Sequence, residues 1–317
     1  MQAHRRRLLS LAVVLIFILS GCSPVVESSK QTLSVYATFY PIYALASLIT
    51  QEVPDLELHC LVQPQDGCLR NYQLSDWDLY LLNYSADAVL AGGCGLESFE
   101  ETLETLSKDR LSLSQVLYGL ELYQANSVDH EEATHFDGSN PYLYMSVDGA
   151  MQIMESLVAT MSILDPRYAE TYESNLQLAL EKLNDLKTEI QEKVRNCSGQ
   201  PVAILNEALF YVAQDYHMDI VATVVRESGT NLYDDALESC LNTLQESGAK
   251  IVLIERQAPK PLVDTLEDAG YVVAQMDVFS TWGETDGFEG YFTAQRANAE
   301  AAANAVAILA DEENIDE

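Results

Sequence analysis

Two histidines in an acidic segment have the side chains to ligate a metal ion. They are His130 and His135 in Val128-Asp129-His130-Glu131-Glu132-Ala133-Thr134-His135-Phe136-Asp137. Imidazole and carboxylate groups are zinc ligands. The five-residue spacing differs from the His-Glu-x-x-His pattern of zinc proteases, and these histidines would diverge on a helix. The alternative is a solvated loop without a ligand.

Residue patterns of catalytic sites are missing from the sequence. It has no phosphate-cradling glycine loop, no Gly-x-Ser-x-Gly elbow, and few histidines near serines or cysteines. Acidic residues number 49, so pairs of carboxylates arise by chance. We therefore expect that the protein is not an enzyme.

Five cysteines follow Cys22: Cys60, Cys68, Cys94, Cys197 and Cys240. None forms a Cys-x-x-Cys pair, which argues against a thiolate zinc site. Cys60 and Cys68 flank a Pro-Gln-Asp-Gly turn, where a local disulfide would fit. An odd number leaves at least one thiol unpaired.

The first 22 residues have the pattern of an export signal. Arg5 to Arg7 precede the apolar run Leu8 to Leu19, which ends in Leu19-Ser20-Gly21-Cys22. As a helix this run would reach about 18 Å, too short for a bilayer core of about 30 Å. The ending resembles a bacterial lipoprotein box, which implies lipidation of Cys22. An ordinary cleaved signal with a chance cysteine is the alternative.

The formal net charge is −32 at pH 7. Removal of residues 1–22 takes away three arginines and no acid, so that −32 becomes −35. Such a surface disfavours nucleic acid and anionic lipid as partners. Solubility alone is the other explanation of the acidity.

Short β-rich runs alternate with helical patterns in both halves of the chain. This alternation is typical of βαβ units and parallel sheets, and about 295 residues after the signal exceed one ordinary core. The predicted strands are residues 33–38, 56–62 and 88–91, then 202–205, 220–224, 251–255 and 272–276. The predicted helices are 41–51, 75–85 and 96–107, then 208–216, 234–247 and 261–268. We expect an α/β fold with two lobes, each a parallel sheet flanked by helices.

A long helix is predicted between the lobes, beginning at Asp165-Pro166. Aspartate suits the N-cap and proline suits the first helical position. One apolar face of roughly 45 Å follows, formed by Tyr168, Tyr172, Leu176, Leu180, Leu183, Leu186, Ile190 and Val194. The charged positions show no sustained heptad pattern, which argues against a coiled coil. The predicted divisions are the signal 1–22, a tether 23–32, an N-terminal lobe 33–146, a helical connection 147–199 and a C-terminal lobe 200–317.

Four segments of the chain resemble the metal-ligand segments of the solute-binding lipoproteins of zinc and manganese ABC importers, an adhesin-like receptor family. They are Cys68 to Tyr72, Asn140 to Tyr144, Leu205 to Leu209 and Met276 to Val278. The resemblance extends from Val35 to about Ala307, and the predicted long helix matches the rigid backbone helix of the family.

The resemblance implies four ligand positions, at three of which the family has histidine. Arg70, Tyr142 and Asn206 take the places of these histidines, and Asp277 keeps the carboxylate. It also implies that the loop with His130 and His135 collects metal. Asp277, His130 and His135 are thus the candidate metal ligands, and Arg70, Tyr142, Asn206 and Asp277 the candidate ligand-binding residues.

The substitutions change the expected ligand chemistry. An amide or a protonated phenol is a poor zinc ligand, and arginine has no lone pair to offer. We therefore expect Arg70 and Asp277 to face each other across a cleft and to hold a small zwitterion or carboxylate, with Tyr142 and Asn206 as neutral walls. Three alternatives stay open: Zn²⁺ or Mn²⁺ as transported ligand, an internal salt bridge that closes an empty cleft, and a receptor-fold lipoprotein that binds a protein partner.

Location and partners follow from the same resemblance. The implied location is the extracytoplasmic face of a bacterial membrane, with the lipid anchor at Cys22. The implied partners are an ABC permease and a small solute or metal ion. We expect a monomer and no bound nucleic acid.

Overall fold

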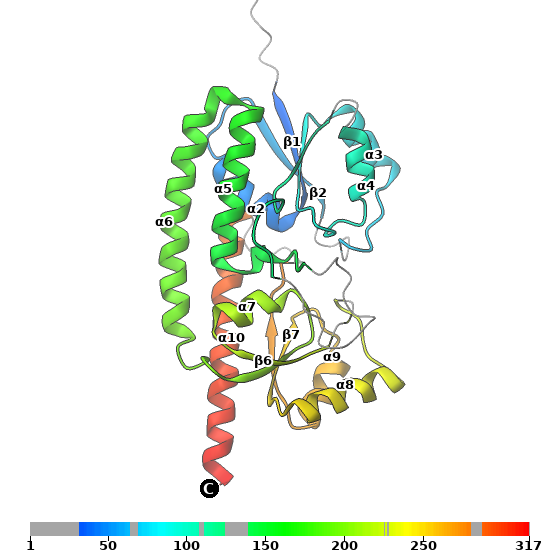
Figure 1. The fold of residues 1–317 in the computed structure, drawn as a ribbon, viewed down its shortest axis with the longest axis vertical. Helices are drawn as coiled ribbons and strands as arrows, with labels where there is room; N and C mark the ends of the chain where they lie inside the picture. Colours follow the sequence, from blue (N-terminus) through cyan, green and yellow to red (C-terminus); the bar gives the residue numbers. More distant parts are fainter. Residues whose placement is uncertain are drawn as a thin grey trace, which may run out of the picture. The chain divides into compact units, whose positions relative to one another are not determined.

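The fold was obtained as a computed structural model. The structure describes residues 32–63, 69–107, 111–123, 139–224, 226, 228–279 and 287–316. Leu33–Glu317 forms one compact unit. Two four-stranded sheets lie within this unit (Figure 1).

The first sheet has the strand order β2-β1-β3-β4, and all its strands are parallel. Its strands are β1 (Leu33–Phe39), β2 (Leu56–Val62), β3 (Ala88–Ala91) and β4 (Ser112–Gln115). The helices of this region are α2 (Tyr40–Ile49), α3 (Asp76–Tyr84) and α4 (Glu100–Ser107). The three predicted strands are confirmed, whereas β4 was not predicted.

The second sheet repeats this scheme in the order β6-β5-β7-β8, again entirely parallel. Its strands are β5 (Pro201–Ile204), β6 (Asp219–Thr223), β7 (Ile251–Glu255) and β8 (Val272–Met276). The accompanying helices are α7 (Leu209–Asp215), α8 (Asp234–Ser247) and α9 (Lys260–Asp268). In each sheet the first strand lies between the second and third, and the α/β fold with two parallel sheets is confirmed.

Long helices connect the two sheets. The 3-10 turn η2 (Leu143–Met145) leads into α5 (Val147–Leu164), which is followed by the 3-10 turn η3 (Pro166–Tyr168) and by α6 (Ala169–Lys193). The predicted long helix is therefore present, although its first turn is 3-10 rather than α. Its buried residues form one face: Tyr172, Leu176, Ala179, Leu183, Leu186 and Ile190.

A second long helix, α10 (Gly287–Asp316), was not predicted. It contacts α2 beside the first sheet, and β7 and β8 in the second. It also packs against α6, and Figure 1 shows α10, in red, alongside that helix. Two long helices thus link the halves of the unit, where the sequence predicted one.

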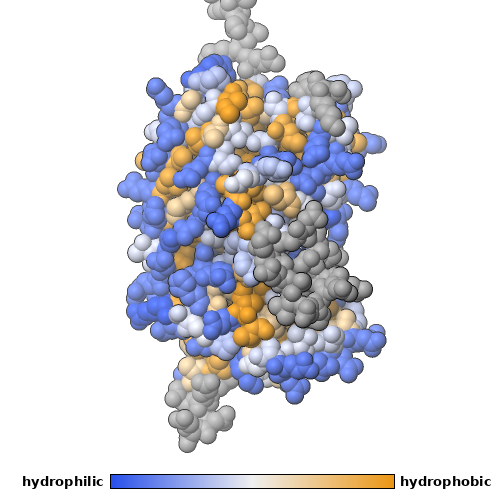
Figure 2. All heavy atoms as spheres, viewed as in Figure 1, coloured by the Kyte–Doolittle hydropathy of each residue, from blue (hydrophilic) through white to orange (hydrophobic). Residues whose placement is uncertain are grey.

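Hydrophilic side chains cover most of the face drawn in Figure 2, with apolar residues in smaller groups between them. The buried core runs through both sheets, and one cluster includes the central strands and α2, α5, α6 and α10. Within the described ranges, no helix combines the length and apolar character that crossing a membrane requires.

Candidate functional site

A pocket of about 270 Å³ lies at the carboxyl ends of strands from both sheets. Ligands of open α/β sheets collect at such strand ends. Its polar lining comes from Tyr40, Gln63, Arg70, Tyr142, Tyr144, Asn206, Ser228, Gly229 and Gln257. The apolar lining is Phe39, Val62, Leu69, Leu96, Ala208, Val278 and Phe279. Three of the four predicted ligand-binding residues therefore share one pocket: Arg70, Tyr142 and Asn206.

Arg70, which lines the pocket, forms an ion pair with Glu207, which is not itself a lining residue. Arg70 Nη1 lies 3.6 Å from Glu207 Oε2, and the side chains are 16% and 14% exposed. Charge-assisted hydrogen bonds are shorter, about 2.7–2.9 Å, so the two groups attract each other without a tight bond. Burial raises the pKa of Glu207 above its ordinary value, and the charge of Arg70 partly opposes this rise.

Asn140 positions both Tyr142 and the segment around Glu207. Its side-chain oxygen accepts a hydrogen bond from the N–H of Tyr142 at 3.0 Å, and its amide nitrogen donates to the carbonyl oxygen of Glu207 at 3.0 Å. The backbone oxygen of Asn140 accepts from the Tyr211 hydroxyl at 2.8 Å. One buried asparagine therefore fixes two walls of the pocket relative to each other.

Asn206 is held in place by a local turn. Its side-chain oxygen accepts from the N–H of Ala208 at 3.0 Å, a bond typical of asparagine in turns. Its amide nitrogen lies 3.4 Å from Glu255 Oε2. Asn206 is 7% exposed, so it contributes a neutral amide to the pocket wall.

Asp277 lies behind the pocket wall, which is formed there by Val278 and Phe279. Its carboxylate accepts the N–H of Phe279 at 2.7 Å, and its backbone N–H and oxygen both bond to the side chain of Asn298 in α10. Arg256 Nη1 lies 3.8 Å from the Asp277 carboxylate. Burial raises the pKa of Asp277, and the bond from Phe279 and the charge of Arg256 lower it.

The predicted facing pair of Arg70 and Asp277 does not form. Arg70 has Glu207 as its counter-ion, and Asp277 has Arg256. The reason is the loop after β8, which Asn298 holds against α10 so that Asp277 is turned out of the pocket lining.

A second Arg–Glu pair lies beside the pocket and is fully buried. Arg226 Nη2 is 2.5 Å from Glu255 Oε1, and the side chains are 2% and 0% exposed. The same oxygen accepts the N–H of Gly229 at 2.8 Å, and Arg226 Nη1 donates to the carbonyl oxygen of Thr230 at 2.8 Å. This pair fixes the loop that brings Ser228 and Gly229 to the pocket.

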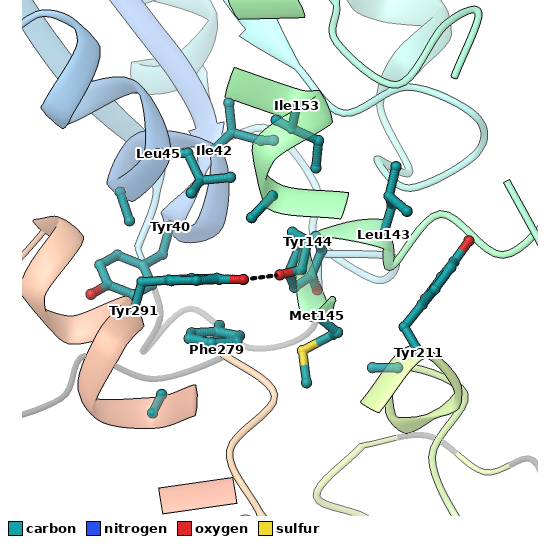
Figure 3. Close-up of a cluster of buried hydrophobic side chains, with 14 of the residues drawn as sticks. Tyr40, Ile42, Leu45, Leu143, Tyr144, Met145, Ile153, Tyr211, Phe279 and Tyr291 are labelled. Carbon is teal, nitrogen blue, oxygen red and sulfur yellow. Dashed lines mark hydrogen bonds between the residues drawn. The ribbon is translucent and has the colours of Figure 1, made fainter. Parts of the chain in front are cut away.

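Aromatic rings form the wall between the pocket and α10. Phe39, Tyr144 and Phe279 make edge-to-face contacts, with ring centroids 5.5 Å and 6.3 Å apart. Tyr291 of α10 stacks on Phe279 at 5.0 Å and donates to the carbonyl oxygen of Tyr144 at 3.0 Å (Figure 3). The wall is therefore rigid and apolar.

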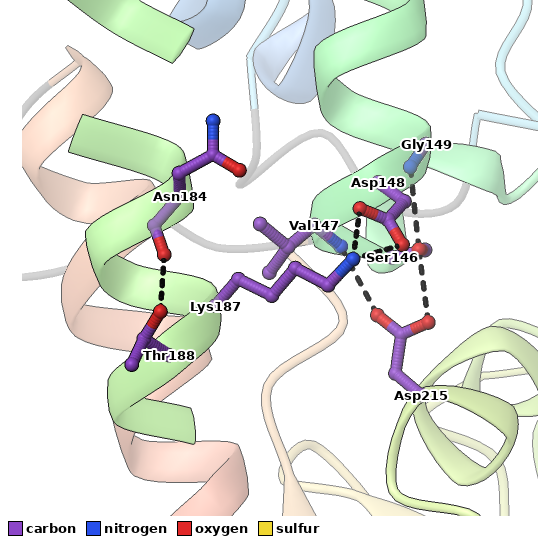
Figure 4. A network of polar contacts seen from close by, with 8 residues as sticks. All are labelled: Ser146, Val147, Asp148, Gly149, Asn184, Lys187, Thr188 and Asp215. Atoms are coloured by element: carbon purple, nitrogen blue, oxygen red, sulfur yellow. Dashed lines mark hydrogen bonds and ion pairs between the residues drawn. The ribbon is translucent and has the colours of Figure 1, made fainter. Parts of the chain in front are cut away.

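Asp215, the last residue of α7, caps the start of α5. It accepts hydrogen bonds from the Ser146 hydroxyl at 3.0 Å and the Val147 N–H at 3.1 Å (Figure 4). Burial raises its pKa to about 6, the two hydrogen bonds lower it, and among the charges nearby Asp148 raises it and Lys187 lowers it. The C-terminal region thus supplies an anion to a helix N-terminus of the connecting region, where negative charge is favoured.

Several predicted residues lie outside the described residues: Cys22, Cys68, His130 and His135. The predicted loop metal site, lipid anchor and Cys60–Cys68 bridge therefore stay predictions. In the part of the chain that the structure describes, no group of three or more His, Cys, Asp or Glu residues could hold a metal ion.

Glu207 is the site residue that the sequence prediction missed. It is the one acidic residue in Leu205 to Leu209. The family resemblance places the ligand position at the neighbouring Asn206, so Glu207 was not predicted. Asp215 gave no signal, because a carboxylate at a helix end is common on protein surfaces.

Comparison with known proteins identifies relatives along most of the chain. The family model described as ZnuA, zinc-uptake complex component A periplasmic, matches residues 35–305. The high-affinity zinc uptake system protein ZnuA of Bacillus subtilis is 22% identical over 292 residues, which cover 87% of this chain and 88% of that protein. The zinc-binding lipoprotein AdcA of Streptococcus pneumoniae is 21% identical over 304 residues, 92% of this chain and 59% of AdcA.

Solved structures show the same fold. FpvC from Pseudomonas aeruginosa in complex with Mn²⁺ superposes with a TM-score of 0.73 at 17% identity, covering 87% of this chain and 98% of FpvC. Zn(II)-bound AdcA from Streptococcus pneumoniae gives 0.72 at 20% identity, covering 87% of this chain and 58% of AdcA. The predicted family is thereby confirmed, and the chain belongs to the family of zinc-uptake complex component A.

Proposed function

We propose that this chain is the extracytoplasmic solute-binding component of an ABC importer, anchored by lipid at Cys22. The observation that carries the proposal is the pocket at the carboxyl ends of both sheets, where Arg70, Tyr142 and Asn206 meet. Membership in a family of uptake components supports the same role. The pocket supplies binding groups, and we assign it no catalytic step.

The cargo proposed for this pocket is a small organic solute, because the donor set does not fit a bare metal ion. A unit charge about 4 Å from a divalent cation, at an effective dielectric near 20, costs roughly 8 kcal/mol. Arg70 lines the pocket, and Glu207, which pairs with it, balances this charge, so the site carries no net negative charge to attract a cation. A nanomolar receptor needs about 12 kcal/mol of binding free energy, which a phenol and an amide beside a neutral ion pair do not supply.

Isothermal titration of the purified protein with ZnCl₂ and MnCl₂ tests the choice of cargo. We expect no sub-micromolar binding of either ion at the pocket. Sub-micromolar zinc binding that survives Asp277→Ala but is lost on replacement of His130 and His135 would place a metal site in their loop. Zinc binding abolished by Asn206→Ala would contradict the proposal for the pocket.

Fractionation and crosslinking test the location and the partner. Cys22→Ala is expected to release the protein from the membrane fraction. Chemical crosslinking of the wild type in cells should capture an integral-membrane permease, and size-exclusion chromatography of the purified protein should give a monomer. A Cys22→Ala protein that stays membrane-bound would overturn the anchor.

A further inference from the structure

The size and walls of the pocket favour an organic ligand with an apolar part. The pocket has a volume of about 270 Å³. A single water molecule needs about 10–15 Å³ of such volume, so the pocket has room for an organic molecule. Phe39, Tyr144 and Phe279 form a rigid aromatic surface on one side. Pockets for small organic molecules combine such apolar walls with a few placed polar groups.

The charged groups favour a ligand that carries both signs. Arg70 lines the pocket, and Glu207, which is not itself a lining residue, lies beside it between the lining residues Asn206 and Ala208. Both side chains are mostly withdrawn from water, yet their nearest atoms are 3.6 Å apart, beyond a tight charge-assisted bond. A lone carboxylate beside this pair would leave a net negative charge in a partly desolvated site, and a lone ammonium group would face Arg70. A zwitterion gives each member of the pair an opposite charge and leaves the site neutral.

We propose that the pocket binds a free α-amino acid with an apolar side chain, its carboxylate held by Arg70 and its ammonium group by Glu207. This proposal rests on the proposed function as a solute receptor. The guanidinium group can hold a carboxylate in bidentate fashion. Asn206 and Tyr142 border the polar end, and the aromatic wall receives the side chain.

Titration calorimetry with each of the twenty L-amino acids tests the proposal. We expect an apolar or aromatic amino acid to bind with micromolar or tighter affinity. For L-phenylalanine, the probes would be phenethylamine, which lacks the carboxylate, and 3-phenylpropionate, which lacks the ammonium group. Each probe is expected to bind at least about 30-fold more weakly than L-phenylalanine, since it lacks the charged group that would bind either Arg70 or Glu207.

Variants separate recognition from folding. Arg70→Gln should weaken amino-acid binding by at least about 30-fold and should abolish the preference for L-phenylalanine over phenethylamine. Glu207→Gln should abolish the preference over 3-phenylpropionate. The matched control is Arg256→Gln, because Arg256 pairs with Asp277 behind the wall and its side chain is 56% exposed. The amino-acid affinity of Arg256→Gln should stay within about twofold of the wild-type value, because the ion pair that it removes is exposed.

The outcomes distinguish this proposal from the receptor role. If no amino acid binds, or if 3-phenylpropionate binds as tightly as L-phenylalanine, the zwitterion proposal is overturned. If a sugar, nucleobase or metal ion then binds in a manner sensitive to Arg70→Gln, the receptor role stands with another cargo. If no solute binds and a deletion strain takes up every solute tested as fast as its parent, the receptor role fails as well.

Discussion

The two Arg–Glu pairs near the pocket have the same types of side chain but differ in the distance between the charged groups and in their exposure to water. Arg226 and Glu255 are 2.5 Å apart, almost completely buried, and joined by further bonds to Gly229 and Thr230. Arg70 and Glu207 are 3.6 Å apart and retain some exposure. The first pair has the geometry of a permanent structural contact, whereas the second has room to exchange partners.

This difference predicts that the Arg226–Glu255 pair contributes mainly to stability and the Arg70–Glu207 pair mainly to ligand binding. A buried pair is strongly destabilised when one partner is removed, because the remaining charge has no compensation. A looser pair beside a pocket can be resolvated or met by a ligand. The contrast between the two pairs predicts different consequences for equivalent substitutions.

The largest expected effect is the loss of stability on Arg226→Met. Its removal leaves the Glu255 carboxylate buried without its cation, which costs about 3–5 kcal/mol in the free energy of unfolding. The matched change Arg70→Met should cost about 1 kcal/mol, because Arg70 and Glu207 are 3.6 Å apart and both side chains retain some exposure to water. Urea unfolding followed by circular dichroism measures both values. Equal losses of unfolding free energy in the two variants would contradict the proposed difference between the two ion pairs.

The next effect concerns the pH dependence of the Asp215 contact. Because burial raises the pKa of this carboxyl from 3.8 to about 6, the folded protein binds the proton more tightly than the unfolded chain. The stability from this group is complete below about pH 4 and is lost as the pH rises through about 6. The amide introduced by Asp215→Asn does not ionise, so this variant should gain about 2–3 kcal/mol relative to wild type between pH 4.5 and 7.5.

Unfolding curves of the wild type and of Asp215→Asn at several pH values check this prediction. A difference between wild type and Asp215→Asn that is constant from pH 4.5 to 7.5 would show that Asp215 does not titrate in this range.

A smaller effect is expected for Asn140→Ala, which removes the bonds to Tyr142 and Glu207. Two hydrogen bonds of ordinary strength predict a loss of about 1–2 kcal/mol, together with weaker solute binding. Asn83→Ala removes an exposed bond to Leu79 within α3 and should stay within about 0.5 kcal/mol. If Asn140→Ala leaves both stability and solute affinity unchanged, Asn140 does not position the pocket.

The strands of both sheets were predictable because buried parallel strands are short apolar runs between helices. Strand β4 was missed because Ser112–Gln115 is polar and only partly buried. Helix α10 was missed although its many alanines favour a helix and Asp286 and Glu289 have the spacing of a helix start signal. Its role comes from tertiary contacts, which periodicity alone does not reveal.

Three of the four predicted ligand-binding residues line the pocket, whereas the ion pairs could not be predicted. Arg70 and Asn206 follow strands β2 and β5, and Tyr142 precedes the 3-10 turn η2, so a resemblance in sequence located these three. The partner of Arg70 depends on which way the loops after β5 and β8 turn. Those turns are set by Asn140 and Asn298, which are distant in sequence from the residues that they hold.

Helix α10 has a mechanical consequence. Its Tyr291 and Gln295 bond to the backbone of Tyr144 and Met145, while its Asn298 bonds to Asp277 after the last strand of the second sheet. Helix α10 therefore binds both halves through residues that lie within about two helical turns of each other. A hinge motion that closes one half onto the other would have to break these hydrogen bonds. A loaded receptor of this build would signal to its transporter through local changes at the pocket rim, with little movement of one half against the other.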